Sequence, residues 1–171
     1  MHPEVAALRE AWRWSYDDLQ PAFDGLHPDN LHRRPAPNCP AISEIAAHLA
    51  YDEAMIVMEL LGKRDPSEWN IDSPLVDATY AWLPDILGAE VSAGLKALGP
   101  TDVYREVKRV HDLMFERTAA LDLPANFKIR EGDTVWATVA GRLIYCAYHA
   151  AYHIGQIYQT RALLGEATPD N

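Results

Sequence analysis

The chain has 171 residues, of which 49% are hydrophobic and 23% are charged, as in an ordinary globular domain, so native disorder is excluded. Fifteen Lys and Arg residues against 25 Asp and Glu residues give a formal net charge of −10. No stripe of basic residues interrupts this acidic composition, so nucleic acid is not an expected ligand.

Neither a signal peptide nor a membrane helix is predicted. The N-terminus lacks the basic, apolar and small-residue segments of a signal peptide, and no stretch approaches the roughly 18 apolar residues of a membrane span. Cys39 and Cys146 form neither a CxxC motif nor a disulfide framework. We therefore expect a cytoplasmic protein with two free thiols, folded as a single domain over residues 1–171.

The N-terminal third predicts two helices separated by an extended connection. Apolar residues recur every three or four positions over residues 5–23, which indicates one amphipathic helix. Four prolines within residues 26–40 predict an extended connection. A second amphipathic helix is expected over residues 41–61, and His48 lies inside it.

The rest of the chain predicts further helices and long connections. Residues 63–83 follow no helical pattern, and a loop of this length is typical of a pocket wall or lid. A short helix is expected over residues 84–98 and a longer one over 101–121, followed by a connection over 123–133 and the longest helix over 134–164. The pattern predicts an all-α protein, a four-helix bundle with crossover connections and one short extra helix.

The last predicted helix carries the most informative motif, HAAYHIGQ. Its two histidines, His149 and His153, are four residues apart and therefore share a helix face, so both imidazoles can reach one metal ion. Gln156 follows on that face and can hydrogen-bond to a bound water or substrate. Such a pair also occurs as two histidines at the surface or hydrogen-bonded in a core, so the motif alone leaves both interpretations open.

His48 is the best candidate for a third ligand. It lies among apolar residues in the second predicted helix, and a three-nitrogen site from two helices leaves a coordination position open, as catalytic sites require. Glu44 and Asp52 lie one turn before and after His48 and can orient its ring. The alternative for both carboxylates is a solvated helix surface.

Other polar residues are weaker candidates for contacts with a substrate. His111 can point into the bundle as a base, although a surface histidine is the more common case. Tyr152, like Gln156, can donate to a substrate, although tyrosines in bundles usually pack. Cys146 is treated as a small buried hydrophobe outside the site. Three further histidines are expected to be exposed: His2, His27 and His32.

Two motifs together resemble the DinB-like (DinB/YfiT) superfamily. Its members show a proline-rich approach, a serine and an acidic residue one turn before a histidine, and a closing HxxxHxGQ helix that ends in LLG or similar. In this chain those features are Pro35, Pro37, Ser43, Glu44 and His48, then His149, His153, Gly155, Gln156 and Gly165. The resemblance covers about residues 5–165. It departs from the family pattern at residues 40–42, where Pro-Ala-Ile replaces a Trp-Ser-Ile-like helix entry.

The resemblance implies a four-helix bundle, often a homodimer, that holds one divalent metal ion, usually zinc or nickel. The ligands carried over are His48, His149 and His153. Family members include transferases and isomerases that use low-molecular-weight thiols such as mycothiol, bacillithiol or glutathione, and others are described only as metal-dependent hydrolases. We therefore expect a thiol-dependent S-transferase or isomerase acting on a small molecule. The alternatives are a metal-dependent hydrolase and a non-catalytic, stress-induced metal-binding bundle.

Overall fold

The computed structural model describes residues 1–87, 89–132 and 134–168, apart from the side chain of Leu83. Gly88, within the helix expected over 84–98, and Asp133, at the end of the connection expected over 123–133, lie outside the described residues. The α-helices are α1 (Pro3–Trp14), α2 (Leu19–Phe23), α3 (Pro28–Leu31), α4 (Ile42–Leu60), α5 (Leu83–Ile86), α6 (Ala93–Lys96), α7 (Pro100–Arg117) and α8 (Val139–Leu163).

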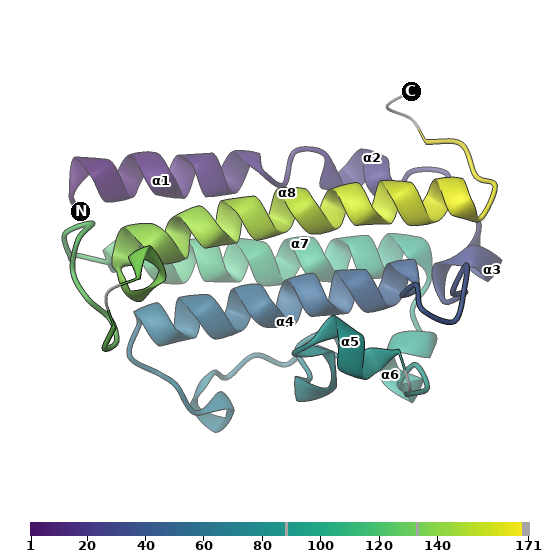
Figure 1. The fold of residues 1–171 in the computed structure, drawn as a ribbon, viewed down its shortest axis with the longest axis horizontal. Helices are drawn as coiled ribbons and strands as arrows, with labels where there is room; N and C mark the ends of the chain where they lie inside the picture. The colour runs from purple at the N-terminus through teal and green to yellow at the C-terminus, as the bar shows by residue number, and fades with distance from the viewer. Residues whose placement is uncertain (88, 133, 169–171) are drawn as a thin grey trace.

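The long helices α1, α4, α7 and α8 lie side by side as a bundle (Figure 1). α4 and α7 run in one direction and α1 and α8 in the other, so the segment between α4 and α7 crosses the length of the bundle, carrying α5 and α6. α8 packs against α1 and α4, and α4 packs against α7. No strand occurs in the described ranges, so the predicted all-α bundle with a crossover is confirmed. Within the same ranges, no helix is both long and apolar enough to cross a membrane.

α4 is buried on almost every side. Of its residues, only Met55 and Glu59 are not buried, because α7 and α8 cover one side and the crossover segment covers another. A helix buried all round is normally apolar, and polar groups inside it need partners. The buried polar residues of α4 are Ser43, Glu44, His48, Asp52 and Glu53.

Prolines explain two differences from the predicted N-terminal elements. The helix expected over residues 5–23 is interrupted by a turn between α1 and α2. In a continuous helix the ring of Pro21 would clash with the carbonyl of Asp17. The connection expected over residues 26–40 contains the one-turn helix α3, which Pro28 opens at a position where a missing N–H costs nothing.

The single helix expected over residues 84–98 is wrong, because α5 and α6 are separate. The Arg34 side chain donates to the carbonyls of Ile86, Leu87 and Ala89 at 2.8, 2.7 and 2.9 Å. A continuous helix would use these carbonyls for its own hydrogen bonds. A contact from a distant arginine therefore replaces the local helical pattern.

Two helix boundaries also differ from the prediction. The helix expected to begin at residue 101 begins one residue earlier, with Gly99 as the N-cap and Pro100 as the first residue of α7. The helix expected to begin at residue 134 begins at Val139, and the side chain of its N-cap Thr138 accepts from the backbone N–H of Gly141 at 3.1 Å. Only glycine fits at 141, since a Cβ there would lie 1.9 Å from a carbonyl oxygen of the preceding 3₁₀ turn.

A buried ion pair fastens the crossover to the bundle. Glu44 is fully buried, accepts a hydrogen bond from the N–H of Ala41 at 2.8 Å and pairs with the Arg34 guanidinium. Through the carbonyls described above, the same guanidinium holds the end of α5. Glu44 is therefore neither a solvated surface charge nor a residue that orients His48, which corrects both expectations.

Replacing Arg34 by methionine is expected to destabilise the fold. Arg34→Met leaves the Glu44 carboxylate buried without its cation, which should lower the free energy of unfolding by about 3 kcal/mol. Urea unfolding followed by circular dichroism measures this change. Arg33→Met, at an exposed neighbouring position, is the control and should change stability by under about 0.5 kcal/mol. Equal effects of the two variants would contradict the importance of the pair.

Candidate metal centre

The packing of α4 against α8 brings three histidines together. His48 comes from α4, and His149 and His153 come from successive turns of α8. The Nε2 atom of His149 lies 3.2 Å from the Nε2 of His48 and 2.9 Å from that of His153. All three side chains are buried, and their potential ligand atoms lie within 4.8 Å of one another. The residues that the sequence selected as ligands therefore converge on one point.

Contacts to the remaining ring nitrogens fix the orientation of two of the imidazoles. The Nδ1 of His48 lies 2.8 Å from the carbonyl oxygen of Tyr80, and the Nδ1 of His153 lies 2.6 Å from the Oε1 of Gln156. Both oxygens only accept, so each Nδ1 carries the proton and each Nε2 presents a lone pair. The third ring, His149, stacks on Tyr145 with centroids 5.1 Å apart. This is the arrangement in which imidazoles bind a metal.

Burial also keeps these imidazoles neutral. Desolvation, with the neighbouring histidines as a second cause, lowers the pKa of His149 to about 2 and that of His153 to about 4. Desolvation likewise lowers the pKa of His48. The Nε2 lone pairs of His48 and His153 face the Nε2 of His149, and a divalent cation between the three nitrogens could accept all of them as donors. The donor set therefore fits a borderline metal ion such as Zn²⁺ or Ni²⁺.

Asp52 adds a carboxylate to the same cluster. Its Oδ2 lies 3.2 Å from the Nε2 of His149 and has no hydrogen-bond partner in the described part of the chain. Burial raises the pKa of Asp52 to about 6, against the opposing effects of the Arg142 charge and a hydrogen bond from Tyr145. Asp52 therefore lies beside His149 and does not orient His48. The carbonyl of Tyr80 orients His48 instead.

The histidines line a pocket of about 380 Å³. The crossover segment supplies one wall, so part of the stretch predicted as a pocket wall or lid does border the site. Aromatic side chains dominate the rest, and no Lys or Arg occurs among the described residues that line it. The non-histidine lining consists of Asp52, Ala81, Trp82, Pro84, Tyr145, Tyr148, Tyr152 and Gln156.

Two weaker candidates lie at this pocket. Tyr152 is 51% exposed, and its hydroxyl accepts from the Nε2 of Gln156 at 3.2 Å. Gln156 in turn contacts His153 through its Oε1, so its amide is already engaged on both sides. The sequence predicted that Gln156 hydrogen-bonds to a bound water or substrate. In the structure its amide instead contacts His153 and Tyr152.

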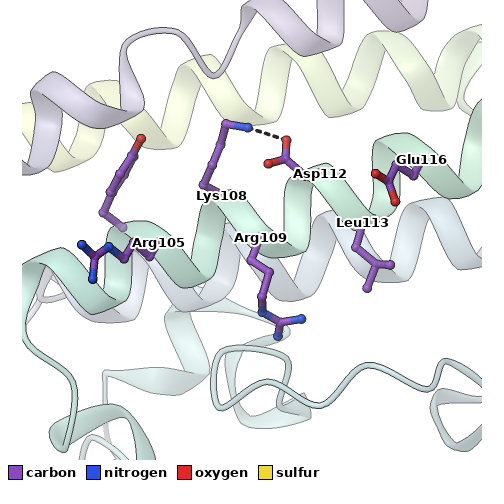
Figure 2. A pocket seen from close by; sticks show the side chains of 7 residues that line it. Arg105, Lys108, Arg109, Asp112, Leu113 and Glu116 are labelled. Atoms are coloured by element: carbon purple, nitrogen blue, oxygen red, sulfur yellow. Dashed lines mark hydrogen bonds and ion pairs between the residues drawn. The ribbon is translucent and has the colours of Figure 1, made fainter.

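A larger hollow of about 520 Å³ lies on the outer face of α7 and contains no histidine (Figure 2). Three of its charged side chains form ion pairs within the same helix: Lys108 pairs with Asp112, and Arg109 pairs with Glu106. Exposed pairs of this kind occur on many helix surfaces and bring no buried reactive group together. The smaller histidine pocket is therefore the candidate site.

His111 is buried, which corrects the expectation of a surface histidine. Its Nδ1 lies 3.1 Å from the Oε1 of Glu53, and its ring stacks on Tyr16 with centroids 3.7 Å apart. Glu53 also accepts from the Nε1 of Trp12 at 2.9 Å and from the Tyr16 hydroxyl. His111 does not line the histidine pocket and instead belongs to a polar network in the core.

The other histidines and the two cysteines considered in the sequence lie outside the site. His32 is half-buried rather than exposed, with its Nδ1 2.9 Å from the Ser43 hydroxyl and its Nε2 3.1 Å from the carbonyl of Leu98. Cys39 and Cys146 are both free thiols, as expected. Burial raises the pKa of the Cys146 thiol, which favours the inert protonated form. His27 is exposed, as expected, whereas His2 is half-buried, with 43% of its side chain accessible.

Comparison with known proteins gives one family. The sequence model of the DinB superfamily matches residues 11–157 of the chain. No curated protein matches the chain. The matched region includes His48, His149 and His153, together with Asp52.

The position of His111 leads to a prediction about stability. Glu53→Ala removes the acceptor shared by Trp12, Tyr16 and His111, and should lower the free energy of unfolding by about 3 kcal/mol in urea titrations. Glu53→Gln keeps one acceptor oxygen and should cost less. Metal content of the folded variants should equal that of the wild type. A loss of metal in both variants would show that the network is part of the site.

Proposed function

Because the chain belongs to the DinB superfamily, we propose that it is a divalent-metal-dependent enzyme with His48, His149 and His153 as ligands. The convergence of their three Nε2 atoms inside the bundle is the observation that carries this proposal. We further propose that residues 1–171 act as one cytoplasmic domain and that two copies form a homodimer, as the family resemblance implies.

The proposed reaction is S-transfer or isomerisation with a low-molecular-weight thiol as co-substrate. His48, His149 and His153 would hold zinc or nickel, and the bound ion would supply the positive charge that lowers the pKa of a thiol toward neutral pH. Asp52 supports this proposal, because its Oδ2 lies 3.2 Å from the Nε2 of His149 and has no hydrogen-bond partner within the described residues. It can receive the proton that the thiol loses, while Tyr145 holds the carboxylate in place.

The walls of the pocket support an apolar electrophile as the second substrate. Trp82, Tyr148 and Tyr152 present aromatic surface at the pocket mouth, where each is more than half exposed. In a transfer reaction the sulfur forms a bond to the electrophilic carbon, and the leaving group departs with its electron pair. Aromatic side chains bind such a carbon skeleton without offering a competing nucleophile.

Metal-dependent hydrolysis is the second candidate function. Asp52 favours it as well, since a carboxylate beside the proposed ligand His149 can accept a proton from an attacking water. A non-catalytic, stress-induced metal-binding protein would need the histidines but not Asp52. The effects of substitutions at these two kinds of residue therefore separate the two catalytic functions from simple metal binding, and the choice of substrate separates transfer from hydrolysis.

Removal of two proposed ligands should abolish metal binding. Wild-type protein purified without a His-tag should contain about one divalent ion per chain by elemental analysis. The double variant His149→Ala, His153→Ala should contain less than about one tenth of that, because a single imidazole holds a metal weakly. His27→Ala, at an exposed position, is the control. A folded double variant with full metal content would refute the site.

Thiol transfer can be tested with monochlorobimane as electrophile and mycothiol, bacillithiol or glutathione as the thiol. The wild type should conjugate at least one thiol faster than the uncatalysed background. Asp52→Asn should slow this reaction about 100-fold with unchanged metal content, because the proton acceptor is lost. Asp112→Asn, on the exposed face of α7, is the matched control. If none of these thiols reacts faster than the background, thiol transfer is contradicted, and hydrolysis or simple metal binding remains.

A further inference from the structure

A second cavity adjoins the histidine pocket. It has a volume of about 230 Å³ and shares two lining residues, Asp52 and Tyr145, with that pocket. A ligand long enough to occupy both would pass along these two side chains. The other residues that line the second cavity include Arg130, Trp136, Arg142 and Ile56.

The two cavities differ in charge. The histidine pocket has no Lys or Arg among its described lining residues, whereas the neighbouring cavity has Arg130 and Arg142. Arg142 is only 8% exposed, and its Nε has no hydrogen-bond partner in the ranges that the structure describes. A buried N–H without a partner is unfavourable, so an oxygen atom of a ligand would satisfy it.

The acidic groups nearby determine which end of the cavity suits an anion. One Arg142 nitrogen already donates to Glu59, and Asp52 lies on the wall shared with the histidine pocket. Arg130 is exposed, and no ion pair or hydrogen bond engages it within the described residues. An anionic group in this cavity is therefore favoured at Arg130, which no acidic side chain among the described residues engages. Guanidinium groups bind carboxylates through paired, charge-assisted hydrogen bonds.

We propose that the co-substrate is a small thiol that carries a carboxylate, with its sulfur in the histidine pocket and its carboxylate on Arg130 and Arg142. This inference rests on the proposed function and narrows its substrate class. Glutathione and bacillithiol carry carboxylates, whereas mycothiol does not. The arrangement therefore favours the first two as co-substrates.

A matched pair of thiols tests the proposal on the zinc-loaded full-length protein. 3-Mercaptopropionate and 3-mercapto-1-propanol differ only in the carboxylate, and isothermal titration calorimetry gives the dissociation constant of each. We expect the carboxylate to strengthen binding at least about tenfold at low salt, as one charge-assisted hydrogen bond would. Arg130→Gln should remove most of that preference. Arg105→Gln, an exposed arginine on α7, should leave it unchanged.

The outcomes separate this inference from the proposed function. Equal affinity of the wild type for the two thiols would overturn the carboxylate site and leave thiol binding intact. An unchanged preference in Arg130→Gln would equally overturn it. If neither thiol binds, the proposal of thiol transfer is contradicted. Binding of propionate, which has the carboxylate but no thiol, then tests the carboxylate site separately. A shift of the Arg142 Nε–H resonance with propionate but not with 1-propanol would support a carboxylate site, and no shift would overturn it.

Discussion

The candidate site depends on placing three neutral imidazoles between two antiparallel helices with their Nε2 atoms close together. All three rings are buried, and for two of them the other nitrogen is engaged elsewhere. The Tyr80 carbonyl engages that nitrogen of His48, and the Gln156 amide engages that of His153. A pair of histidines one turn apart on α8 supplies the spacing, and α4 supplies the third ring at the same level.

Placing one histidine on a helix as buried as α4 has consequences for the rest of the core. The helix also carries three buried carboxylates, and each has a distinct environment. Glu44 pairs with Arg34, Glu53 accepts from three side chains, and Asp52 alone keeps an oxygen without a partner among the described residues. The carboxylate left unsatisfied is the one beside the histidines, where a proton acceptor or a ligand oxygen would be used.

The crossover between α4 and α7 has both a structural and a functional part. Its carbonyls at Ile86, Leu87 and Ala89 bond to Arg34, and its carbonyl at Tyr80 orients His48. The same segment places Trp82 at the pocket. A connection that contains only short helices can serve these purposes, since many of its backbone groups are free to bond to side chains from elsewhere in the chain.

The sequence by itself determined the helical class, the bundle and the shared helix face of His149 and His153, because the periodicity of apolar residues and the four-residue spacing on α8 are local properties. His48 as their third partner came from the family resemblance of two motifs far apart in the chain. The tertiary structure decided which carboxylate faces the histidines, that His111 lies in the core and that α5 and α6 are separate helices. These outcomes depend on contacts between residues far apart in the chain, such as Arg34 with Ala89 and His111 with Glu53. Helical periodicity gives the face on which a side chain lies but not its partner, since the partner is set by how the helices pack.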